Sequence, residues 1–209
     1  EIGESGSGST RTEPVALGDP LDANTGVLDV TGLRSNTEYR YRLWMFDPTD
    51  ETAADGRVVA RGSFTTANSN PRKLTIAFGS CHKPAAGNNF GLRSAMNRWR
   101  ALANQDTYDL LILMGDQVYG DHIEEFWPRS TWHQRYRKRY DQLWQYQPMR
   151  RVLRRTPTYM ILDDHEVADD FGTFLDDPER VQAGLDAYGV YQDAHNPERR
   201  GDERHFSLQ

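Results

Sequence analysis

The 209 residues of this chain suffice for one large domain, or for a small domain followed by a medium one. With 27% charged residues, 11% aromatic residues and a mean hydropathy of -0.80, the composition predicts a packed core beneath an extensive solvated surface. The formal net charge of -6 argues against nucleic acid as a partner, because nucleic-acid binding relies on Lys and Arg to neutralise phosphates.

Two further features of the sequence concern its surroundings. No stretch approaches the roughly 18 apolar residues that a membrane span needs, and the chain does not open on a signal peptide, so we expect a soluble protein. Cys81 is the one cysteine of the sequence, so it cannot form an internal disulfide and does not indicate the redox compartment.

The first third of the chain has the patterns of β structure. Residues 1–12 are polar and rich in Gly and Ser, which predicts a flexible lead-in. Strands are predicted at 26–30, 39–46 and 57–66, where β-forming residues are separated by turn residues and a charged loop. In the second of these strands, aromatic and Arg residues alternate and should face opposite sides of a sheet.

This β segment resembles the last strands of a fibronectin type III-like sandwich. The resemblance rests on "LRSNTEYRYRL" (33–43) followed by "GSFTT" (62–66), with Tyr39 at the position of the tyrosine corner of such folds. A complete sandwich has about seven strands. The resemblance therefore implies that residues 1–68 hold a partial domain of this kind.

After a polar linker at 67–73, the pattern changes to that of an α/β domain, which we place at 69–209. Continuous apolar runs, typical of strands in a parallel sheet, alternate with helical patterns. Such alternation predicts strands that are buried on both faces, with helices on each side of the sheet. The apolar runs lie at 74–78, 110–114 and 158–162, and a helix is predicted at 92–105.

Residues 129–155 predict a pair of helices rich in basic and aromatic side chains, with nine Lys or Arg against one acid. One interpretation is a face that buries the aromatic side chains beside a solvated basic face. The alternative is an electropositive rim that attracts anionic phosphate esters. The aromatic side chains of residues 129–155 are Trp132, Tyr136, Tyr140 and Trp144.

A later helix should start with Asp177 as its cap and Pro178 in its first turn.

Each predicted strand of the α/β domain ends in reactive side chains, in "GSCH" (79–82), "GDQVYGDH" (115–122) and "DDHE" (163–166). In open α/β sheets, ligands bind outside the carboxyl ends of the strands, so we expect the three segments to meet at one site. Residues 163–177 carry seven carboxylates in fifteen positions and no Lys or Arg. Bound cations would stabilise so much negative charge.

The side chains at these strand ends predict a metal centre. Carboxylates suit hard divalent cations, whereas a thiolate together with a phenolate favours a transition metal of higher charge such as Fe(III). Asp116 is a candidate ligand, because a carboxylate at the end of a core strand has few structural explanations. Cys81 and Tyr119 are also candidates, although each could instead be an ordinary core residue.

Adjacent residues in "DDHE" cannot all face one ion, and we expect Asp164 and His165 to lie in the site. Asp163 or Glu166 could be a carboxylate that orients an imidazole. Two other histidines, His82 and His122, are expected to be surface or loop residues.

Four motifs in this part of the chain carry a resemblance to a known family. They are "GSC" after one strand, "MGDQVY" after the next, "PTYMILDDHEVADD", and "AYGVYQDAHNP" further on. Together they resemble the PhoD-like alkaline phosphatases and phosphodiesterases, within the calcineurin-like metallophosphatases. The resemblance covers about residues 70–209 and extends to the preceding β domain.

The resemblance implies a metallophosphatase-type layered α/β sandwich, of which this chain holds the N-terminal half, and a dinuclear metal centre. Cys81, Asp116 and Tyr119 would hold Fe(III). Asp116 would also bridge to a Ca²⁺ ion, to which Asp164 contributes. His165 would face the substrate, as a ligand of phosphate or as a general acid to the leaving oxygen.

Three departures from the family pattern are visible. Leu162 replaces a frequent Trp and Gly120 stands where an acidic residue often follows the Tyr, which bears on substrate and metal preference. Further His and Asp ligands of the family lie outside this chain. The resemblance also implies an extracellular or periplasmic location.

The sequence therefore predicts hydrolysis of phosphoric esters, whether diesters or monoesters, by a metal-activated hydroxide. The alternative is a non-catalytic extracellular binding fragment, in which the β segment and the basic-aromatic surface recognise a polymer or a protein. In that case the acidic strand ends would hold a structural metal ion only.

Overall fold

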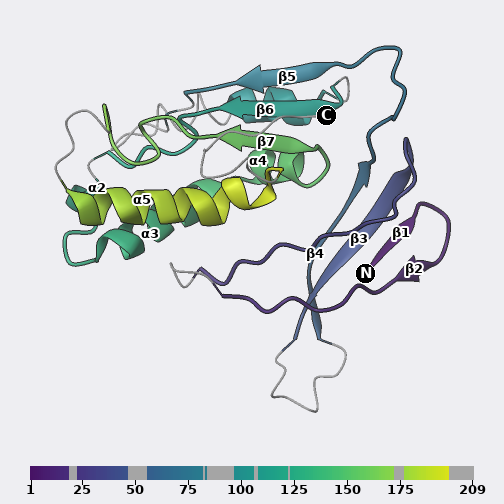
Figure 1. The fold of residues 1–209 in the computed structure, drawn as a ribbon, viewed down its shortest axis with the longest axis horizontal. Coiled ribbons are helices and arrows are strands. Elements are labelled where there is room, and N and C mark those ends of the chain that lie inside the picture. The colour runs from purple at the N-terminus through teal and green to yellow at the C-terminus, as the bar shows by residue number, and fades with distance from the viewer. Residues whose placement is uncertain are drawn as a thin grey trace.

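The computed structural model describes residues 1–18, 23–46, 56–81, 83, 97–105, 108–121, 123–171 and 177–197. They form a four-stranded antiparallel sheet and a three-stranded parallel sheet with associated helices, so the fold is mixed α/β (Figure 1). No described helix is both long and apolar enough to cross a bilayer. The predictions for His82 and His122 lie outside the described residues.

The antiparallel sheet has the strand order β2-β1-β3-β4. Its two long strands are β3 (Glu38–Met45) and β4 (Arg57–Thr65), which confirm the strands predicted at 39–46 and 57–66. The register pairs Tyr39 with Phe64.

The prediction of a flexible lead-in at residues 1–12 is wrong. This segment forms a hairpin of β1 (Ile2–Glu4) and β2 (Ser9–Thr10), and β1 pairs with β3. The chain reverses near Gly6, whose φ of 88° favours glycine. Pairing with a long strand gives the backbone of this polar segment hydrogen-bond partners that its composition did not reveal.

The prediction of a strand at residues 26–30 is also wrong. β1 and β4 already occupy both edges of β3, so this segment has no place beside that strand. Val27 and Leu28 are exposed, so the apolar residues that suggested a strand are not buried against the sheet.

Tyr39 is buried, and its phenol oxygen accepts the backbone N–H of Arg34 at 2.9 Å. This is the bond to the upstream backbone that a tyrosine corner makes. The described residues before the linker form a single sheet, so they do not include the second layer of a sandwich. A partial fibronectin type III-like domain at 1–68 therefore stays a prediction.

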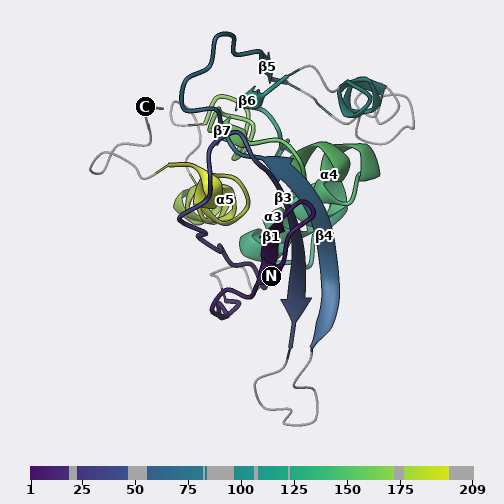
Figure 2. The same cartoon turned by 90° about the vertical axis from the view of Figure 1, so that its right-hand side faces the viewer.

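Tyr41 connects the antiparallel sheet to the rest of the molecule. Its hydroxyl donates to the carbonyl of Arg154, 3.1 Å away, immediately after α4 (Gln147–Leu153). Burial raises the pKa of Tyr41, which keeps the hydroxyl protonated as a donor. In Figure 2, β3 and β4 run from this region toward the bottom of the view.

The parallel sheet has the order β5-β6-β7 and confirms the three predicted apolar strands. Its register pairs Phe78 with Ile112, and Leu113 with Met160. The strands are β5 (Ile76–Gly79), β6 (Leu110–Met114) and β7 (Thr158–Ile161).

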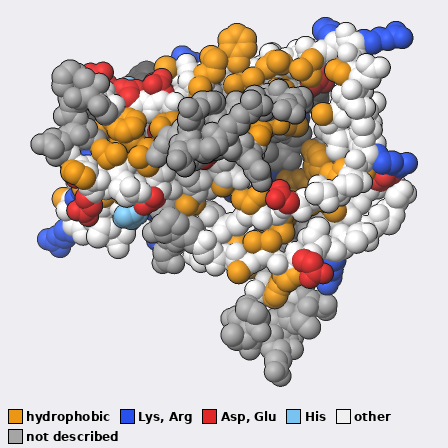
Figure 3. All heavy atoms as spheres, viewed as in Figure 1, with side chains coloured by type: hydrophobic (Ala, Val, Ile, Leu, Met, Phe, Trp, Pro, Cys, Tyr) orange, Lys and Arg blue, Asp and Glu red, His pale blue; other side chains and the backbone are white. Residues whose placement is uncertain are grey.

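One face of the parallel sheet is packed and the other is open in the described part of the chain. Leu111, Leu113 and Met160 pack against Trp99, which lies in the helix at 97–103, and against α4. On the opposite face, Phe78 is 71% exposed. Hydrophobic side chains gather along the top of Figure 3, where Figure 1 places β5. The expectation that the strands are buried on both faces is therefore not met. The other exposed apolar side chains are Ile76, Met114 and Ile161.

The helix pair predicted at 129–155 is confirmed as α3 (Trp132–Trp144) and α4. α3 starts at a capping box, in which the Gln134 N–H donates to the Thr131 hydroxyl at 3.3 Å. Tyr136 and Tyr140 are fully buried, and the two flanking Trp side chains are half-buried. Of the helix predicted at 92–105, residues 97–103 are helical, and 92–96 lie outside the described residues.

α5 (Pro178–Tyr191) starts as predicted, because the Asp177 carboxylate accepts the backbone N–H of Arg180 at 3.0 Å. α5 packs against α3 around a core that includes Val118, which belongs to the loop after β6. The helices thus support the segment that carries the predicted ligands. Two short elements complete the fold, α2 (Ile123–Phe126) and the 3-10 helix η1 (Asp193–His195).

We predict that Tyr39→Phe lowers the free energy of unfolding by about 1 kcal/mol, because the Arg34 N–H loses the acceptor of a part-buried hydrogen bond while the ring contacts are kept. Urea unfolding of both proteins measures the difference. Equal unfolding free energies would contradict a stabilising role for this hydrogen bond.

Candidate functional site

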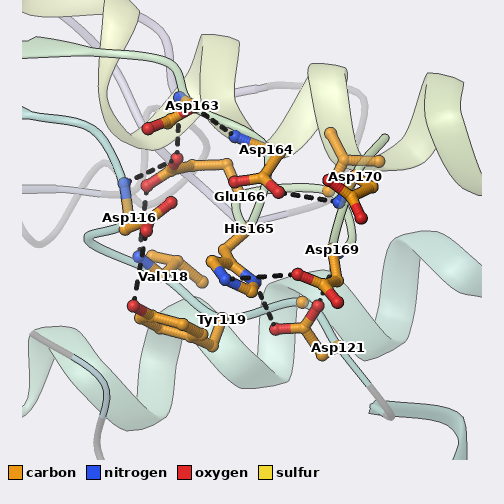
Figure 4. A network of polar contacts seen from close by, with 12 residues as sticks. Asp116, Val118, Tyr119, Asp121, Asp163, Asp164, His165, Glu166, Asp169 and Asp170 are labelled. Atoms are coloured by element: carbon orange, nitrogen blue, oxygen red, sulfur yellow. Dashed lines mark hydrogen bonds and ion pairs between the residues drawn. The ribbon is translucent and has the colours of Figure 1, made fainter. Parts of the chain in front are cut away.

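The three reactive segments meet at the carboxyl ends of the parallel strands, as the sequence predicts. The Cys81 N–H donates to the carbonyl of Gly115 at 3.3 Å, which joins the ends of β5 and β6. The Gly120 N–H donates to the carbonyl of His165 at 2.7 Å, which joins the loops after β6 and β7. Figure 4 shows the side chains that these segments bring together.

The backbone turns sharply where the strands end. Cys81 and Asp116 have φ values of 55° and 58°, in the left-handed region that few non-glycine residues adopt. Gly115 has a φ of 87°, and a Cβ atom added there would lie 2.3 Å from the Cβ of Asp163. Glycine at this position therefore permits close contact between the two loops, and conformations of this kind often occur at functional sites.

Asp116 lies at the centre of the cluster and is 6% exposed. Its Oδ2 atom is 3.2 Å from the Cys81 Sγ, which donates to it, and 3.4 Å from the hydroxyl of Tyr119. Its Oδ1 atom is buried and has no hydrogen-bond partner among the described residues. An unpartnered carboxylate oxygen is costly to bury, and a coordinated cation would compensate it.

A metal ion would fit beside this carboxylate. Asp116, Asp164 and His165 each offer one ligand atom, and these atoms lie within 4.8 Å of one another. Carboxylate oxygens and an imidazole nitrogen are common metal ligands. Cys81 and Tyr119 adjoin the same group through Asp116, so the structure brings all five predicted site residues together.

Tyr119 is a buried phenol with a charged neighbour. Burial, followed by the adjacent Asp116 carboxylate, raises the pKa of Tyr119. Deprotonation of this phenol therefore requires nearby positive charge, which a metal ion would provide. Two groups flank the ring: the His165 imidazole, with 4.3 Å between ring centroids, and the Lys83 Nζ, 4.9 Å from the centroid.

Cys81 is exposed, so the interpretation of this cysteine as an ordinary core residue is wrong.

The basic face predicted for the helices at 129–155 is not solvated throughout. Arg139 of α3 is buried instead of solvated, and its Nε–H donates to the carbonyl of Tyr119 at 2.9 Å. Arg180 of α5 donates to the next carbonyl, that of Gly120, at 3.1 Å. Both arginines thus hold the backbone of the loop after β6.

Glu166 is fully buried and holds the same loop from the other side. Its carboxylate accepts backbone N–H groups from the loops after β6 and β7, so one side chain fixes both segments. Burial raises the pKa of Glu166, and the N–H donors oppose this by stabilising the ionised carboxylate. The donors are Gln117 at 2.6 Å, Asp116 and Asp163 at 3.0 Å each, and Val118 at 3.2 Å.

The carboxylate that contacts an imidazole in the site is neither Asp163 nor Glu166, contrary to the expectation from the sequence. Asp121 lies beside His165, with 2.8 Å between its Oδ2 and the Nδ1 of the ring. The sequence patterns did not single out Asp121. Its place five residues after Asp116, in the same loop, was the available signal, but residues 163–177 alone hold seven other carboxylates.

Comparison with known proteins decides the family. The family model of the PhoD-like phosphatases matches residues 77–200. The chain belongs to the PhoD-like phosphatase family. This confirms the resemblance carried by the sequence motifs.

A solved structure described as "Structure of PhoD" is similar in fold to this PhoD-like chain. The two are 23% identical in sequence, with a TM-score of 0.56. The similarity covers 80% of this chain and 32% of that chain, so the present chain spans about a third of the length of the solved structure. No curated protein matches the sequence.

We predict that Glu166→Gln lowers the free energy of unfolding by about 2–3 kcal/mol. The amide keeps one acceptor oxygen and turns its NH₂ group toward N–H donors that the carboxylate now satisfies. Thermal or urea unfolding measures the change, with the exposed Glu13→Gln as the matched control. Equal losses in the two variants would contradict the role assigned to Glu166.

Proposed function

We propose that this chain contributes part of the active site of a metal-dependent phosphoric-ester hydrolase, acting on phosphodiesters, phosphomonoesters or both. The observation that carries the proposal is the grouping of Asp116, Asp164 and His165 around the unpartnered Oδ1 of Asp116. Membership of the PhoD-like phosphatase family supports a phosphoester substrate.

Cys81, Asp116 and Tyr119 would hold an Fe(III) ion, and Asp116 and Asp164 would hold a Ca²⁺ ion. The donor set supports this division, because thiolate and phenolate favour a cation of high charge whereas carboxylates suit calcium. When bound, such ions lower the pKa of a coordinated water and stabilise negative charge on the phosphoryl oxygens.

The protein's own groups would prepare this site before substrate binds. Glu166 holds the backbone of Asp116 from one side, and Arg139 holds the carbonyl of Tyr119 from the other. The imidazole of His165 would hydrogen-bond to a phosphate oxygen, or donate a proton from its Nε2 to the leaving oxygen. Such preorganisation lowers the cost of orienting groups during the reaction.

The finer assignments of domain and location belong to the same proposal. Residues 1–68 would be part of a fibronectin type III-like domain, and the hydrogen bond between Tyr39 and Arg34 supports this. Residues 69–209 would be the N-terminal part of the metallophosphatase sandwich. By family resemblance, the protein would work in the periplasm or outside the cell.

We predict that Asp116→Asn abolishes stoichiometric metal binding, because the amide removes the negative charge at the centre of the ligand group. Elemental analysis of the purified chain measures metal content. Hydrolysis of a chromogenic phosphodiester and a chromogenic phosphomonoester is followed in the same samples.

The exposed Asp29→Asn provides the matched control and should keep the metal content of the wild type. Absence of bound metal in the wild type after supply of iron and calcium would contradict the proposal. Metal that is bound equally by the Asp116→Asn variant would contradict the assignment of the site.

We predict that Tyr119→Phe removes a visible charge-transfer absorption from the iron-loaded chain, because a phenolate bound to Fe(III) is the group that would give such a band. Absorption spectra of the two proteins at equal iron content test this. Tyr108→Phe serves as the control, since that hydroxyl donates to the carbonyl of Leu102, away from the site. A band that persists in Tyr119→Phe would exclude Tyr119 as its origin.

A further inference from the structure

We propose that Gln117, oriented by Gln192, is a positioning residue that holds the peptide group before Asp116 and so presents the central carboxylate of the site. The inference rests on the proposed function for its effect on metal binding, but the positioning itself can be measured in the metal-free chain. Gln117 follows Asp116 directly in the loop after β6, and Gln192 is the C-cap residue of α5.

The peptide group before Asp116 is held at both ends. Its carbonyl, that of Gly115, accepts the Gln117 Nε2 at 2.5 Å and the Cys81 N–H at 3.3 Å. Its N–H, that of Asp116, donates to the Oε2 of Glu166 at 3.0 Å (Figure 4). Since a peptide group is planar, the donors at its carbonyl and the acceptor at its N–H fix one orientation of the whole unit.

The backbone at Asp116 does not favour this orientation by itself. Its φ of 58° lies in the left-handed region, which residues other than glycine rarely adopt. Half a turn of the preceding peptide group would return φ to negative values, and Gly115 would tolerate the accompanying change. The same rotation would turn the carbonyl toward the Glu166 carboxylate and the N–H toward the NH₂ group of Gln117. Hydrogen bonds at both ends therefore hold a strained conformation.

The amide of Gln117 can face the carbonyl in one way only. A carbonyl oxygen only accepts hydrogen bonds, so the NH₂ group must point to Gly115 and Oε1 must point away from it. This Oε1 accepts the Nε2 of Gln192 at 2.8 Å, and the Oε1 of Gln192 accepts the hydroxyl of Tyr140 at 2.5 Å. Burial raises the pKa of Tyr140, which keeps the hydroxyl protonated as a donor. Every donor in this row therefore points toward the site.

The three side chains of the row are fully buried, with Gln117, Gln192 and Tyr140 each at 0% exposure. Water cannot replace a lost partner at such a position, so each amide depends on its neighbour in the row. Tyr140 belongs to α3, and Gln192 ends α5, so the packed helix pair fixes the Gln117 amide from the side opposite the site. The helices thus position the peptide group before Asp116 through two amides.

Amide hydrogen exchange of the metal-free chain tests the proposal. Gln117→Met keeps a side chain of similar length and the backbone N–H, but it removes the amide. We expect the Asp116 N–H to exchange about tenfold faster in this variant, because the peptide group then leaves Glu166 more often. The reference in the same protein is the N–H of Leu111 in β6, which donates to the carbonyl of Pro157 at 3.0 Å.

The reference amide separates positioning from a general loss of stability. If the side chain of Gln117 only stabilised the fold, both amides would exchange faster by the same factor, and that result would overturn the proposal. Unchanged exchange at Asp116 would overturn it as well. The exposed Gln147→Met is the matched control, and we expect both amides to exchange in it as in the wild type.

Gln192→Met tests the same row from the helix side. The Gln117 amide can still reach the carbonyl of Gly115, but it loses the donor that orients it. We therefore expect exchange of the Asp116 N–H at a rate between those of the wild type and Gln117→Met. If Gln117→Met does not fold, this variant still decides, because exchange at Asp116 as in the wild type would overturn the proposal.

Metal binding supplies a separate measurement for the functional part. We expect Gln117→Met to raise the Kd of Ca²⁺ by about tenfold to a hundredfold, as loss of a group that orients a ligand does. Calorimetric titration of Ca²⁺ into the purified chain measures this, with Gln147→Met as the control. Equal Kd in the wild type and Gln117→Met would overturn the effect on the site. If the exchange results are as expected but the wild type binds no metal, the positioning role stands and the proposed function fails.

Discussion

The buried carboxylate of Glu166 is the interaction on which the arrangement of the site depends. Its oxygens accept backbone N–H groups from two loops that follow different strands, so the loops are fixed relative to each other. A buried carboxylate without donors would be costly, and buried N–H groups without acceptors would be costly too. Each side therefore stabilises the other, and Asp116 is held in its left-handed conformation.

Two arginines hold the same loop from the packed helices. Arg139 of α3 and Arg180 of α5 donate to the carbonyls of Tyr119 and Gly120 in the loop after β6. The arginines thus fix the backbone without neutralising Asp116, whose Oδ1 stays unpartnered in the described part of the chain. Such a division leaves the central carboxylate available to a cation.

The sequence was sufficient to predict the parallel strands and the convergence of their ends, because continuous apolar runs and the reactive residues after them are local patterns. It did not reveal the roles of Asp121 and Arg139, since each depends on a partner in another element. The hairpin at residues 1–12 was missed for a similar reason. Its pairing with β3 is a tertiary contact that overrides a flexible composition.

Anomalous X-ray scattering from crystals grown with iron and calcium would test the metal site most directly. We expect an iron peak in contact with the Cys81 Sγ, an Asp116 carboxylate oxygen and the Tyr119 hydroxyl, with a calcium ion on the side of Asp164. Crystals that show no peak beside Asp116, or that place iron only at other residues, would contradict the proposed metal centre.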